Sequence, residues 1–269
     1  MTHAPSTPAT TTGTHEALPP DGLVTVTHDD GVATVRFGHP KGNSLPGHLL
    51  RELAARIRHV SADAAVRVIV LRSGGHGPFC AGASFDELVA IDAPERGQEF
   101  FSGFAGVILA MLRAPQFVVT RVHGKTAGGG VGLVAASDYA IATPNASCKL
   151  SELAVGIGPF VVGPVIEKRI GTAAFGAMAV DADWRDARWA QQHGLYARLA
   201  DNVAELDAQV DALARRLAGF NPEAMAEIKR IVWAGTEDWD RLLADRAATS
   251  GRLVLSDFTR RAIAAFNAG

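Results

Sequence analysis

Residues 123–133 read HGKTAGGGVGL, and they directly follow the apolar, β-branched run Phe117–Val122. The run predicts a buried strand, and the glycine cluster opens a segment with helical spacing. Glycines expose backbone N–H groups, and such donors at the start of a helix favour a negatively charged oxygen. This stretch therefore predicts a site for a bound phosphate or for an oxyanion that develops during a reaction.

Strand and helix patterns alternate through the first two thirds of the chain. A hairpin is predicted for Leu23–Thr27 and Val32–Phe37, because both runs alternate and Asp29-Asp30-Gly31 joins them. Further strands are expected at residues 66–71, 117–122 and 139–142, and helices at residues 46–59, 85–91 and 95–113. The fold class predicted is α/β.

The last third of the chain carries helical patterns only. Helices are expected at residues 172–180, 186–193, 203–218, 222–233, 239–250 and 257–266, with Asn221 as an N-cap before Pro222. Residues 1–20 are rich in Thr, Pro and Ala and predict a disordered tail. We therefore divide the chain into a tail (1–20), a core (21–200) and an α-helical C-terminal subdomain (201–269), where subunit contacts are expected.

Composition and charge argue against several classes of protein. The chain has 269 residues, of which 48% are hydrophobic, and a formal net charge of -2 without long Lys/Arg runs, which disfavours nucleic acid and anionic membranes as partners. Cys80 and Cys148 lie far apart, and the histidines lack metal-ligand spacing, so neither a disulfide nor a metal site is expected. No apolar run approaches ~20 residues, and no signal peptide is recognised, so we expect a cytoplasmic protein.

A second small-residue loop and one carboxylate complete a candidate site. Residues 78–87, PFCAGASFDE, run from the end of a predicted strand into a predicted helix, and they expose further backbone donors. Together with Gly129 they could supply two N–H groups to one carbonyl oxygen, and such a preorganised donor is worth ~3 to 4 kcal/mol in a transition state. Glu152 lies among apolar neighbours and is the candidate acid.

These segments, in this order, resemble the enoyl-CoA hydratase/isomerase (crotonase) family. The resemblance runs from Leu23 to Phe266, and its motifs are residues 79–83, 122–124, 127–130, 137–138 and 151–156. It implies a crotonase-like β-β-α superhelix core and an α-helical C-terminal trimerisation subdomain. It also implies an acyl-CoA thioester substrate, coenzyme A as part of the substrate with no separate cofactor, and a homotrimer or a dimer of trimers.

The resemblance also assigns roles by position. Ala83 and Gly129 match the residues whose backbone N–H groups hold the thioester oxygen, and Glu152 matches a catalytic acid/base. Ala81, Ser84 and Phe85 match the loop that contacts coenzyme A or the substrate.

One position departs from the pattern of the family's hydratases. They carry a second glutamate where this chain has Gly132, which is assigned to the acyl pocket. Residues 158–163 are more apolar than the family's glycine-rich loop, so Phe160 is assigned to the same pocket. One carboxylate suffices for a 1,3-proton shift, which favours isomerisation of an enoyl-CoA. Hydration of a 2-enoyl-CoA by Glu152, with a substitute acid or with none, remains an alternative, as does a non-catalytic acyl-CoA-binding protein.

Two acids next to the second loop could replace the missing carboxylate. Asp86 and Glu87 are interpreted instead as solvated residues in the first turn of a helix. Asp138 is interpreted as a structural carboxylate, and Cys80 as a buried, unreactive thiol.

Other candidates also have structural interpretations. His123 and Lys125 could touch a phosphate but are expected to be structural, and Arg260 and Arg261 are assigned to a solvated helix face. Trp233 and Trp239 are expected in the core or at subunit contacts.

A dinucleotide site is the rival hypothesis. Residues 130–135 fit G-x-G-x-x-A, and Glu152 follows at about the spacing of a ribose-binding acid. In such a site the glycine turn should follow its strand directly, whereas residues 124–128 intervene here.

Overall fold

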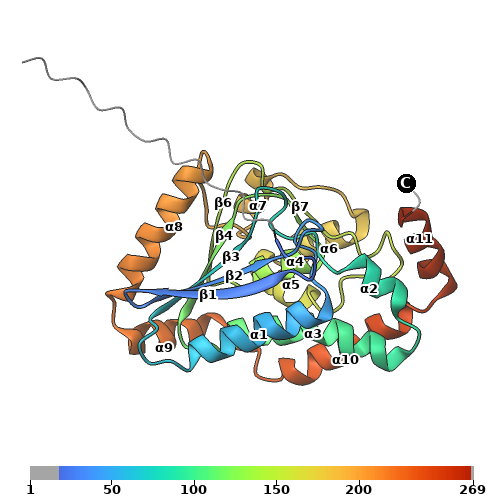
Figure 1. Ribbon diagram of the computed structural model, residues 1–269, viewed down its shortest axis with the longest axis horizontal. Helices are drawn as coiled ribbons and strands as arrows, with labels where there is room; N and C mark the ends of the chain where they lie inside the picture. Colours follow the sequence, from blue (N-terminus) through green and yellow to red (C-terminus); the bar gives the residue numbers. More distant parts are fainter. Residues whose placement is uncertain (1–17, 268–269) are drawn as a thin grey trace, which may run out of the picture.

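The computed structural model describes residues 18–267, so most of the tail predicted at 1–20 lies outside the described residues. A six-stranded sheet runs through the molecule (Figure 1). Its strands, in spatial order, are β1 (Leu23–Asp29), β2 (Val32–Gly38), β3 (Val68–Ser73), β4 (Phe117–Val122), β6 (Tyr139–Ala142) and β8 (Arg198–Leu199). β1 and β2 are antiparallel, and every later pair in the sheet is parallel.

The predicted hairpin is confirmed by the turn between β1 and β2. Asp30 and Gly31 both have positive φ angles, 42° and 78°. A two-residue turn of this kind matches the right-handed twist of the strands that it joins, and Asp-Gly is a preferred sequence for it. The local sequence therefore sets the register of the first strand pair.

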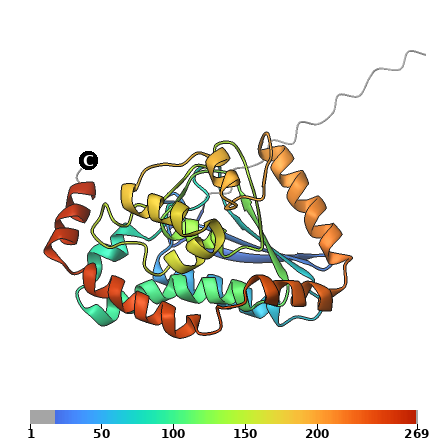
Figure 2. The same ribbon diagram turned by 180° about the vertical axis from the view of Figure 1, so that it is seen from behind.

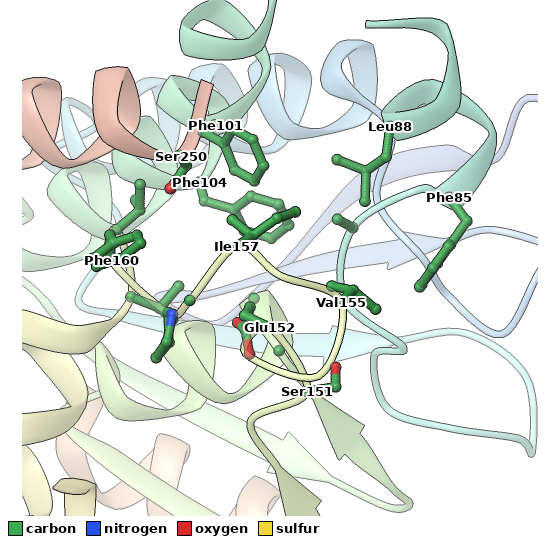
Figure 3. Close-up of a pocket in the computed structure, with 18 of the residues that line it drawn as sticks. Phe85, Leu88, Phe101, Phe104, Ser151, Glu152, Val155, Ile157, Phe160 and Ser250 are labelled. Atoms are coloured by element: carbon green, nitrogen blue, oxygen red, sulfur yellow. The ribbon is translucent and has the colours of Figure 1, made fainter. Parts of the chain in front are cut away.

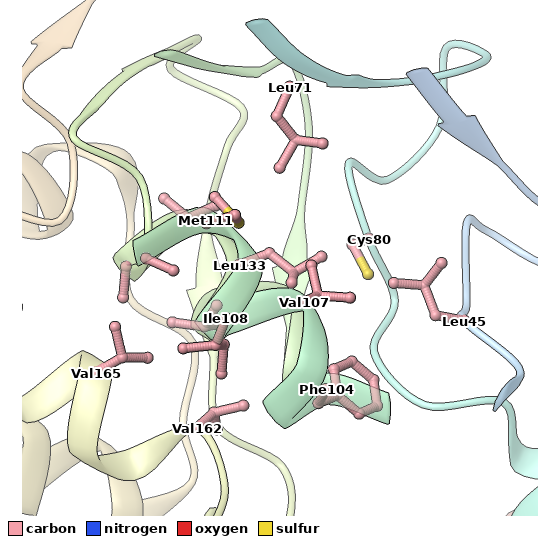
Figure 4. Packing of buried hydrophobic residues seen from close by; sticks show 14 of the residues in the cluster. Leu45, Leu71, Cys80, Phe104, Val107, Ile108, Met111, Leu133, Val162 and Val165 are labelled. Atoms are coloured by element: carbon pink, nitrogen blue, oxygen red, sulfur yellow. The ribbon is translucent and has the colours of Figure 1, made fainter. Parts of the chain in front are cut away.

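Helices cover both faces of the sheet and extend beyond it. They are α1 (Gly47–Ser61), α2 (Phe85–Ala90), α3 (Pro94–Arg113), α4 (Gly129–Ala135), α5 (Gly163–Ile170), α6 (Thr172–Asp181), α7 (Ala187–Gln192), α8 (Val203–Ala218), α9 (Pro222–Val232), α10 (Trp239–Leu253) and α11 (Asp257–Asn267). A large apolar core includes the buried faces of α1, α3 and α10, and a smaller one lies between the sheet and α8. Figure 4 shows Leu133 of α4 among Val107, Ile108 and Met111 of α3.

Two glycines let α10 lie directly on α3. A Cβ atom added to Gly97 would stand 2.7 Å from the Cα of Gly251, and one added to Gly251 would stand 2.5 Å from the nitrogen of Gln98. No side chain fits between the two backbones at this point. The C-terminal helices are therefore in close contact with the first part of the chain, as Figures 1 and 2 show from opposite sides.

The predicted α/β class is confirmed, and so are most of the elements. Val203–Ala218 and Phe117–Val122 have the bounds that were predicted, and Asn221 caps α9 by accepting a hydrogen bond from the backbone N–H of Glu223 at 2.9 Å. Helix α5 was not predicted, because Gly163 and Pro164 at its start are typical of loops. Proline is nevertheless well accommodated in the first turn of a helix.

Three very short strands also escaped prediction, among them β8 at the edge of the main sheet. β5 (Thr126–Ala127) and β7 (Cys148–Lys149) pair in parallel to form a separate sheet, and Cys80 forms a bridge with Thr126. Two residues are too few to show a period. β5 and β7 bring the two glycine-containing loops together. No helix among the described residues is long and apolar enough to cross a membrane.

Candidate active site

A cavity of about 580 Å³, its open mouth included, lies between α3, the start of α4 and residues 151–162 (Figure 3). Phe101, Phe104 and Phe160 provide much of its apolar wall, while Ala83, Gly129 and Glu152 also line it. The three residues assigned from the sequence to an oxyanion site and an acid are thus brought to one cavity. A largely apolar hollow with a few convergent polar groups is the usual form of a small-molecule site.

Gly82 shows how closely the two backbone loops approach each other. It has a φ of +91°, and a Cβ atom added to it would lie 3.0 Å from the carbonyl oxygen of Ala127 and 3.6 Å from the nitrogen of Gly129. Because any side chain here would be strained and crowded, the loop requires glycine. The close approach sets Ala83, the next residue, beside the start of α4.

The backbone around Ala83 is fixed by a parallel bridge to Leu45. The N–H of Leu45 donates to the Gly82 carbonyl at 2.8 Å, and the N–H of Ser84 donates to the Leu45 carbonyl at 3.2 Å. Ala83 lies between Gly82 and Ser84, and no hydrogen bond from its N–H is found among the described residues. Gly129 is the first residue of α4, so its N–H has no partner within the helix. Both donors can therefore serve a ligand.

Gly128 brings the start of α4 against the carboxylate of Glu152. Its φ is +50°, and a Cβ atom added to it would lie 3.2 Å from Oε1 of Glu152. The carboxylate and the N–H groups at the helix start therefore face the same part of the cavity.

Glu152 is a carboxylate in an apolar setting. Its Oε2 is shielded from solvent and has no hydrogen-bond partner among the described residues. Burial raises the pKa of Glu152 to about 7, and hydrogen bonding to the backbone at Glu152 and Ser151 opposes only part of that rise. A carboxyl group with such a pKa can both accept and return a proton near neutral pH.

The chain matches the profile of the family described as "Enoyl-CoA hydratase/isomerase" over residues 27–259. The chain belongs to the enoyl-CoA hydratase/isomerase family. It is 26% identical over 247 residues to a Bacillus subtilis protein named "Probable enoyl-CoA hydratase". The alignment covers 88% of this chain and 93% of the relative. The sequence resemblance is thereby confirmed, and this enzyme shares the crotonase fold.

Solved structures agree with the assignment to the enoyl-CoA hydratase/isomerase family. A crystal structure of an enoyl-CoA hydratase from Mycobacterium avium is 30% identical, has a TM-score of 0.79, and covers 91% of this chain and 96% of its own. An enoyl-CoA hydratase from Bacillus halodurans superposes with a TM-score of 0.83 over 90% of this chain and 99% of its own. At 19% identity it supports the fold alone.

Gly132 does not line the cavity, and its assignment to the acyl pocket is corrected. A Cβ atom added to it would lie 2.5 Å from Cγ1 and 2.7 Å from Cβ of Val162, and Val162 itself lines the cavity. Val162 therefore stands between Gly132 and the cavity. Phe160 does line it.

The loop assigned to coenzyme A is only partly in the cavity wall. Ala81 and Phe85 line the cavity. Ser84 is buried, precedes α2 and is not part of the cavity lining, and its backbone N–H donates to the carbonyl of Leu45.

Some lining residues were not singled out from the sequence. Phe101 and Phe104 lie on the buried face of α3, and Ser250 lies on α10. The helical period predicted the helix that carries the two phenylalanines, but not what they face. Nothing in the local sequence marks Ser250, because the crossing of α3 and α10 brings it to the cavity.

The two acids that follow Ala83 in the chain, Asp86 and Glu87, lie outside the cavity lining. The carboxylate of Asp86 forms an exposed ion pair with Lys41, and Oε2 of Glu87 accepts a hydrogen bond from the backbone N–H of Gly47 at 2.6 Å. Asp86 is a solvated residue, as interpreted, whereas Glu87 also supports the start of α1. Neither is placed to act as a second acid.

The remaining candidates are structural. Asp138 accepts hydrogen bonds from the backbone of Val118 and from Nε1 of Trp233. Burial raises the pKa of the Cys80 thiol to about 12 and lowers the pKa of His123 to about 4. Both groups are therefore neutral near pH 7.

Surface and core positions also match their interpretations. Lys125 lies over the ring of Trp184, with 5.2 Å between Nζ and the ring centroid. Arg260 and Arg261 are exposed on α11, and Trp233 and Trp239 are buried.

The dinucleotide hypothesis is not supported by the local fold. β5 lies between β4 and α4, so the glycine turn does not follow its strand directly. In addition, Glu152 lies against Gly128 and lines the cavity.

Proposed function

We propose that this enzyme acts on acyl-CoA thioesters and moves the double bond of an enoyl-CoA, with Glu152 as the acid/base and the N–H groups of Ala83 and Gly129 as the oxyanion hole. One observation carries the proposal. Among the described residues, Glu152 is the single ionisable side chain that lines the cavity, and it faces the start of α4. One carboxylate beside two backbone donors suits a reaction that moves one proton.

The proposed reaction converts a 3-enoyl-CoA into a 2-enoyl-CoA. The carboxylate of Glu152 removes a proton from C2, and the electron pair of that C–H bond moves into a dienolate, whose negative charge reaches the thioester oxygen. The N–H groups of Ala83 and Gly129 stabilise this charge. Glu152 then returns the proton to C4, so the double bond lies between C2 and C3 and the enzyme regains its starting form.

The environment of Glu152 fits both halves of this cycle. A pKa of about 7 leaves comparable amounts of carboxylate and carboxylic acid near neutral pH. An acid/base with a pKa close to the working pH combines a usable fraction of each form with a small barrier to proton transfer. An exposed glutamate, with a pKa near 4.3, would be a weaker base at pH 7 and would remove the C2 proton less readily.

The space beside Gly132 supports a one-carboxylate site. Val162 fills the side of the cavity toward which a side chain at position 132 would extend. Hydration requires that a water is deprotonated while a proton reaches the α-carbon, and the cavity offers a single ionisable group for both tasks. General acid–base assistance is worth ~10²- to 10⁴-fold, so a missing partner would slow hydration markedly.

Hydration of a 2-enoyl-CoA by Glu152 is the second candidate. The similarity to proteins named as enoyl-CoA hydratases favours it. In that case one carboxylate would both activate the water and supply the proton. The proposed oxyanion hole would stabilise an enolate in either reaction.

Activity with a 3-enoyl-CoA, in the wild type and in two variants, tests the proposal. We expect purified enzyme to convert a 3-enoyl-CoA into the 2-enoyl isomer, and Glu152→Gln to abolish the conversion while still binding the thioester. Glu95→Gln, which changes an exposed residue of α3, is the matched control and should retain full activity. Conversion by Glu152→Gln at the wild-type rate would refute the assigned role.

Labelled water separates isomerisation from hydration. With a 2-enoyl-CoA in oxygen-18 water, a hydratase places the label in a 3-hydroxyacyl product. In deuterium oxide, an isomerase introduces only carbon-bound deuterium. We expect the second result, and labelled hydroxyl product as the main species would replace isomerisation with hydration.

Other parts of the sequence-based hypothesis remain proposals. Ala81 and Phe85 are proposed contacts of the coenzyme A portion of the substrate, and no separate cofactor is proposed. A homotrimer or a dimer of trimers remains the predicted assembly.

A further inference from the structure

The C-terminal end of α4 is held by a side chain from another helix. Arg169 of α5 donates through Nε to the carbonyl of Ala135 at 3.1 Å and through Nη2 to the carbonyl of Ser137. The last carbonyls of a helix lack partners within the helix and carry a partial negative charge. The guanidinium group therefore supplies both hydrogen bonds and a complementary charge at this end.

Arg169 is itself fixed by a neighbouring aromatic ring. The guanidinium carbon lies 5.0 Å from the centroid of the Trp233 ring, and Nε1 of Trp233 donates to Oδ1 of Asp138 at 2.8 Å. Asp138 follows α4 almost directly in the chain. The same cluster thus restrains the guanidinium and the segment that it binds.

The cluster is anchored to the sheet and to α9. Oδ2 of Asp138 accepts from the backbone N–H of Val118 on β4 at 2.7 Å and pairs with Nζ of Lys229 at 2.8 Å. The side chains of Lys229 and Asp138 are only 3% and 8% exposed. Buried, charge-assisted contacts of this kind hold their partners in one arrangement.

Helix α4 is short enough for its two ends to be coupled. It has seven residues, all buried, and at 1.5 Å per residue it spans about 10 Å. A buried helix of two turns moves as one body, so a displacement at Ala135 is transmitted to Gly129. The donors of an oxyanion hole are effective only within a few tenths of an ångström of the right place.

We propose that Arg169 is a positioning residue that fixes the N–H of Gly129 by holding the far end of α4. This inference rests on the proposed function, which assigns that N–H to the thioester oxygen. Arg169 does not line the cavity, so it acts through the helix and not on the substrate. Its removal should weaken polarisation of the thioester carbonyl more than it weakens binding.

The test compares Arg169→Leu and Arg169→Lys with Lys168→Met. Lys168 is the preceding residue of α5, is exposed, and donates to the carbonyl of Ala234 away from α4. We expect Arg169→Leu to lower kcat for the double-bond shift by roughly tenfold or more, with KM changed by less than about threefold. Arg169→Lys, which keeps the charge and part of the hydrogen bonding, should recover some of the loss, and Lys168→Met should match the wild type.

A spectroscopic readout separates positioning from general stability. Bound butanoyl-CoA, labelled with carbon-13 at its carbonyl, reports polarisation by the oxyanion hole as a lowered carbonyl stretching frequency. We expect a smaller shift in Arg169→Leu and a full shift in Glu152→Gln, although both variants lose activity. If Arg169→Leu does not fold, Arg169→Lys is judged by the same measurement.

Two outcomes overturn the inference, and a third concerns the proposed function. A folded Arg169 variant with wild-type kcat and a wild-type carbonyl shift removes the positioning role. So does a loss of kcat with an unchanged shift, because the effect then does not pass through the oxyanion hole. Absence of any carbonyl shift in the wild-type enzyme would refute the proposed oxyanion hole itself.

Discussion

At its first turn, helix α4 has no side-chain cap, and Gly129 lines a cavity. At its last residue, Ala135, and just beyond it at Ser137, the backbone carbonyls accept hydrogen bonds from Arg169. The carboxylate of Asp138, which follows, contacts the backbone N–H of Val118, the indole of Trp233 and the ammonium of Lys229. Both ends are buried, yet only one has its hydrogen bonds completed within the protein. An unpaired buried donor destabilises a fold by about 1 to 3 kcal/mol, so the free N–H at the start of α4 lowers the stability of the protein unless a ligand binds it.

The completed end also explains how the open end can persist. The charged groups around Asp138 link α4 to β4, α5 and α9, whereas the residues around Gly129 are chiefly glycines and apolar side chains. Hydrogen bonds and ion pairs fix the C-terminal end of α4, whereas the N-terminal end borders the cavity. The predictions below change each end in turn.

The largest expected effect on stability is at the completed end. Asp138→Ala leaves the buried ammonium of Lys229 without its counter-charge, although the carbonyls of Met111 and Gln116 still accept from it. Breaking a buried pair in this way costs about 3 to 5 kcal/mol. Urea unfolding should show this loss, and Asp245→Ala, at an exposed position of α10, should change stability by less than about 0.5 kcal/mol. Equal unfolding free energies for the two variants would contradict the comparison.

At the open end, the ionisation of Glu152 makes stability depend on pH. Burial raises its pKa in the folded protein to about 7, whereas in the unfolded chain it should lie near 4.3. The folded state then favours the protonated form, so the wild type loses stability as pH rises between these values. One pH unit corresponds to about 1.4 kcal/mol, so Glu152→Gln should gain roughly 3 kcal/mol over the wild type between pH 4 and pH 8.

Thermal or urea unfolding at several pH values measures this difference. Glu95→Gln, at an exposed position, serves as the control and should follow the wild type. Parallel curves for Glu152→Gln and the wild type would show that the carboxyl group is not destabilised by burial.

A methyl group at the first residue of α4 tests how tightly the open end is packed. In Gly129→Ala the new Cβ would lie 2.1 Å from Cε1 of Phe104, so the ring or the helix must move. Overpacking of this kind costs about 1 to 3 kcal/mol. Displacement of the donor should lower kcat by ~10²-fold.

The matched control for this change is Gly176→Ala. A Cβ atom at Gly176, within α6, would meet no atom within 4 Å. Alanine should raise stability there by up to about 1 kcal/mol, because it is the better helix former. A Gly129→Ala enzyme as active as Gly176→Ala would mean that the start of α4 can shift without consequence.

The middle of the helix gives the smallest expected effect. Gly132→Ala places a Cβ 2.5 Å from Cγ1 of Val162, and the clash should disappear in Gly132→Ala with Val162→Gly. A double-mutant cycle should therefore show a favourable coupling of about 1 kcal/mol between the two substitutions. Additive unfolding free energies would show that Val162 does not determine the space at position 132.

Local sequence patterns predicted the elements, and they located the site where its residues lie on short segments. The alternation in Leu23–Thr27 and the helical period in Val203–Ala218 depend on nearby residues, so both elements were recognised. The glycine-rich loops that hold Ala83 and Gly129 carry a local signal for exposed backbone donors, and the family resemblance assigned the two residues themselves. The contact between Gly128 and Glu152 depends on the pairing of β5 with β7, for which two-residue strands provide no period.

Long-range packing explains what the sequence did not reveal. Gly132 was placed in the pocket because it matches the position of a glutamate in the family's hydratases, and the sequence cannot show that Val162 covers it. Helix α5 was hidden by Gly163 and Pro164, and with it the role of Arg169. Ser250 reaches the cavity only through the crossing of two helices that are far apart in the sequence.

That crossing limits how the chain can be divided and recombined. Because α10 meets α3 backbone to backbone at Gly97 and Gly251, the wall of the cavity includes a residue from each side of any boundary near position 200. A chimera that took its last 70 or so residues from a relative would exchange part of the wall of the cavity together with the C-terminal helices. The C-terminal helices therefore contribute a residue to the wall of the cavity as well as packing against α3.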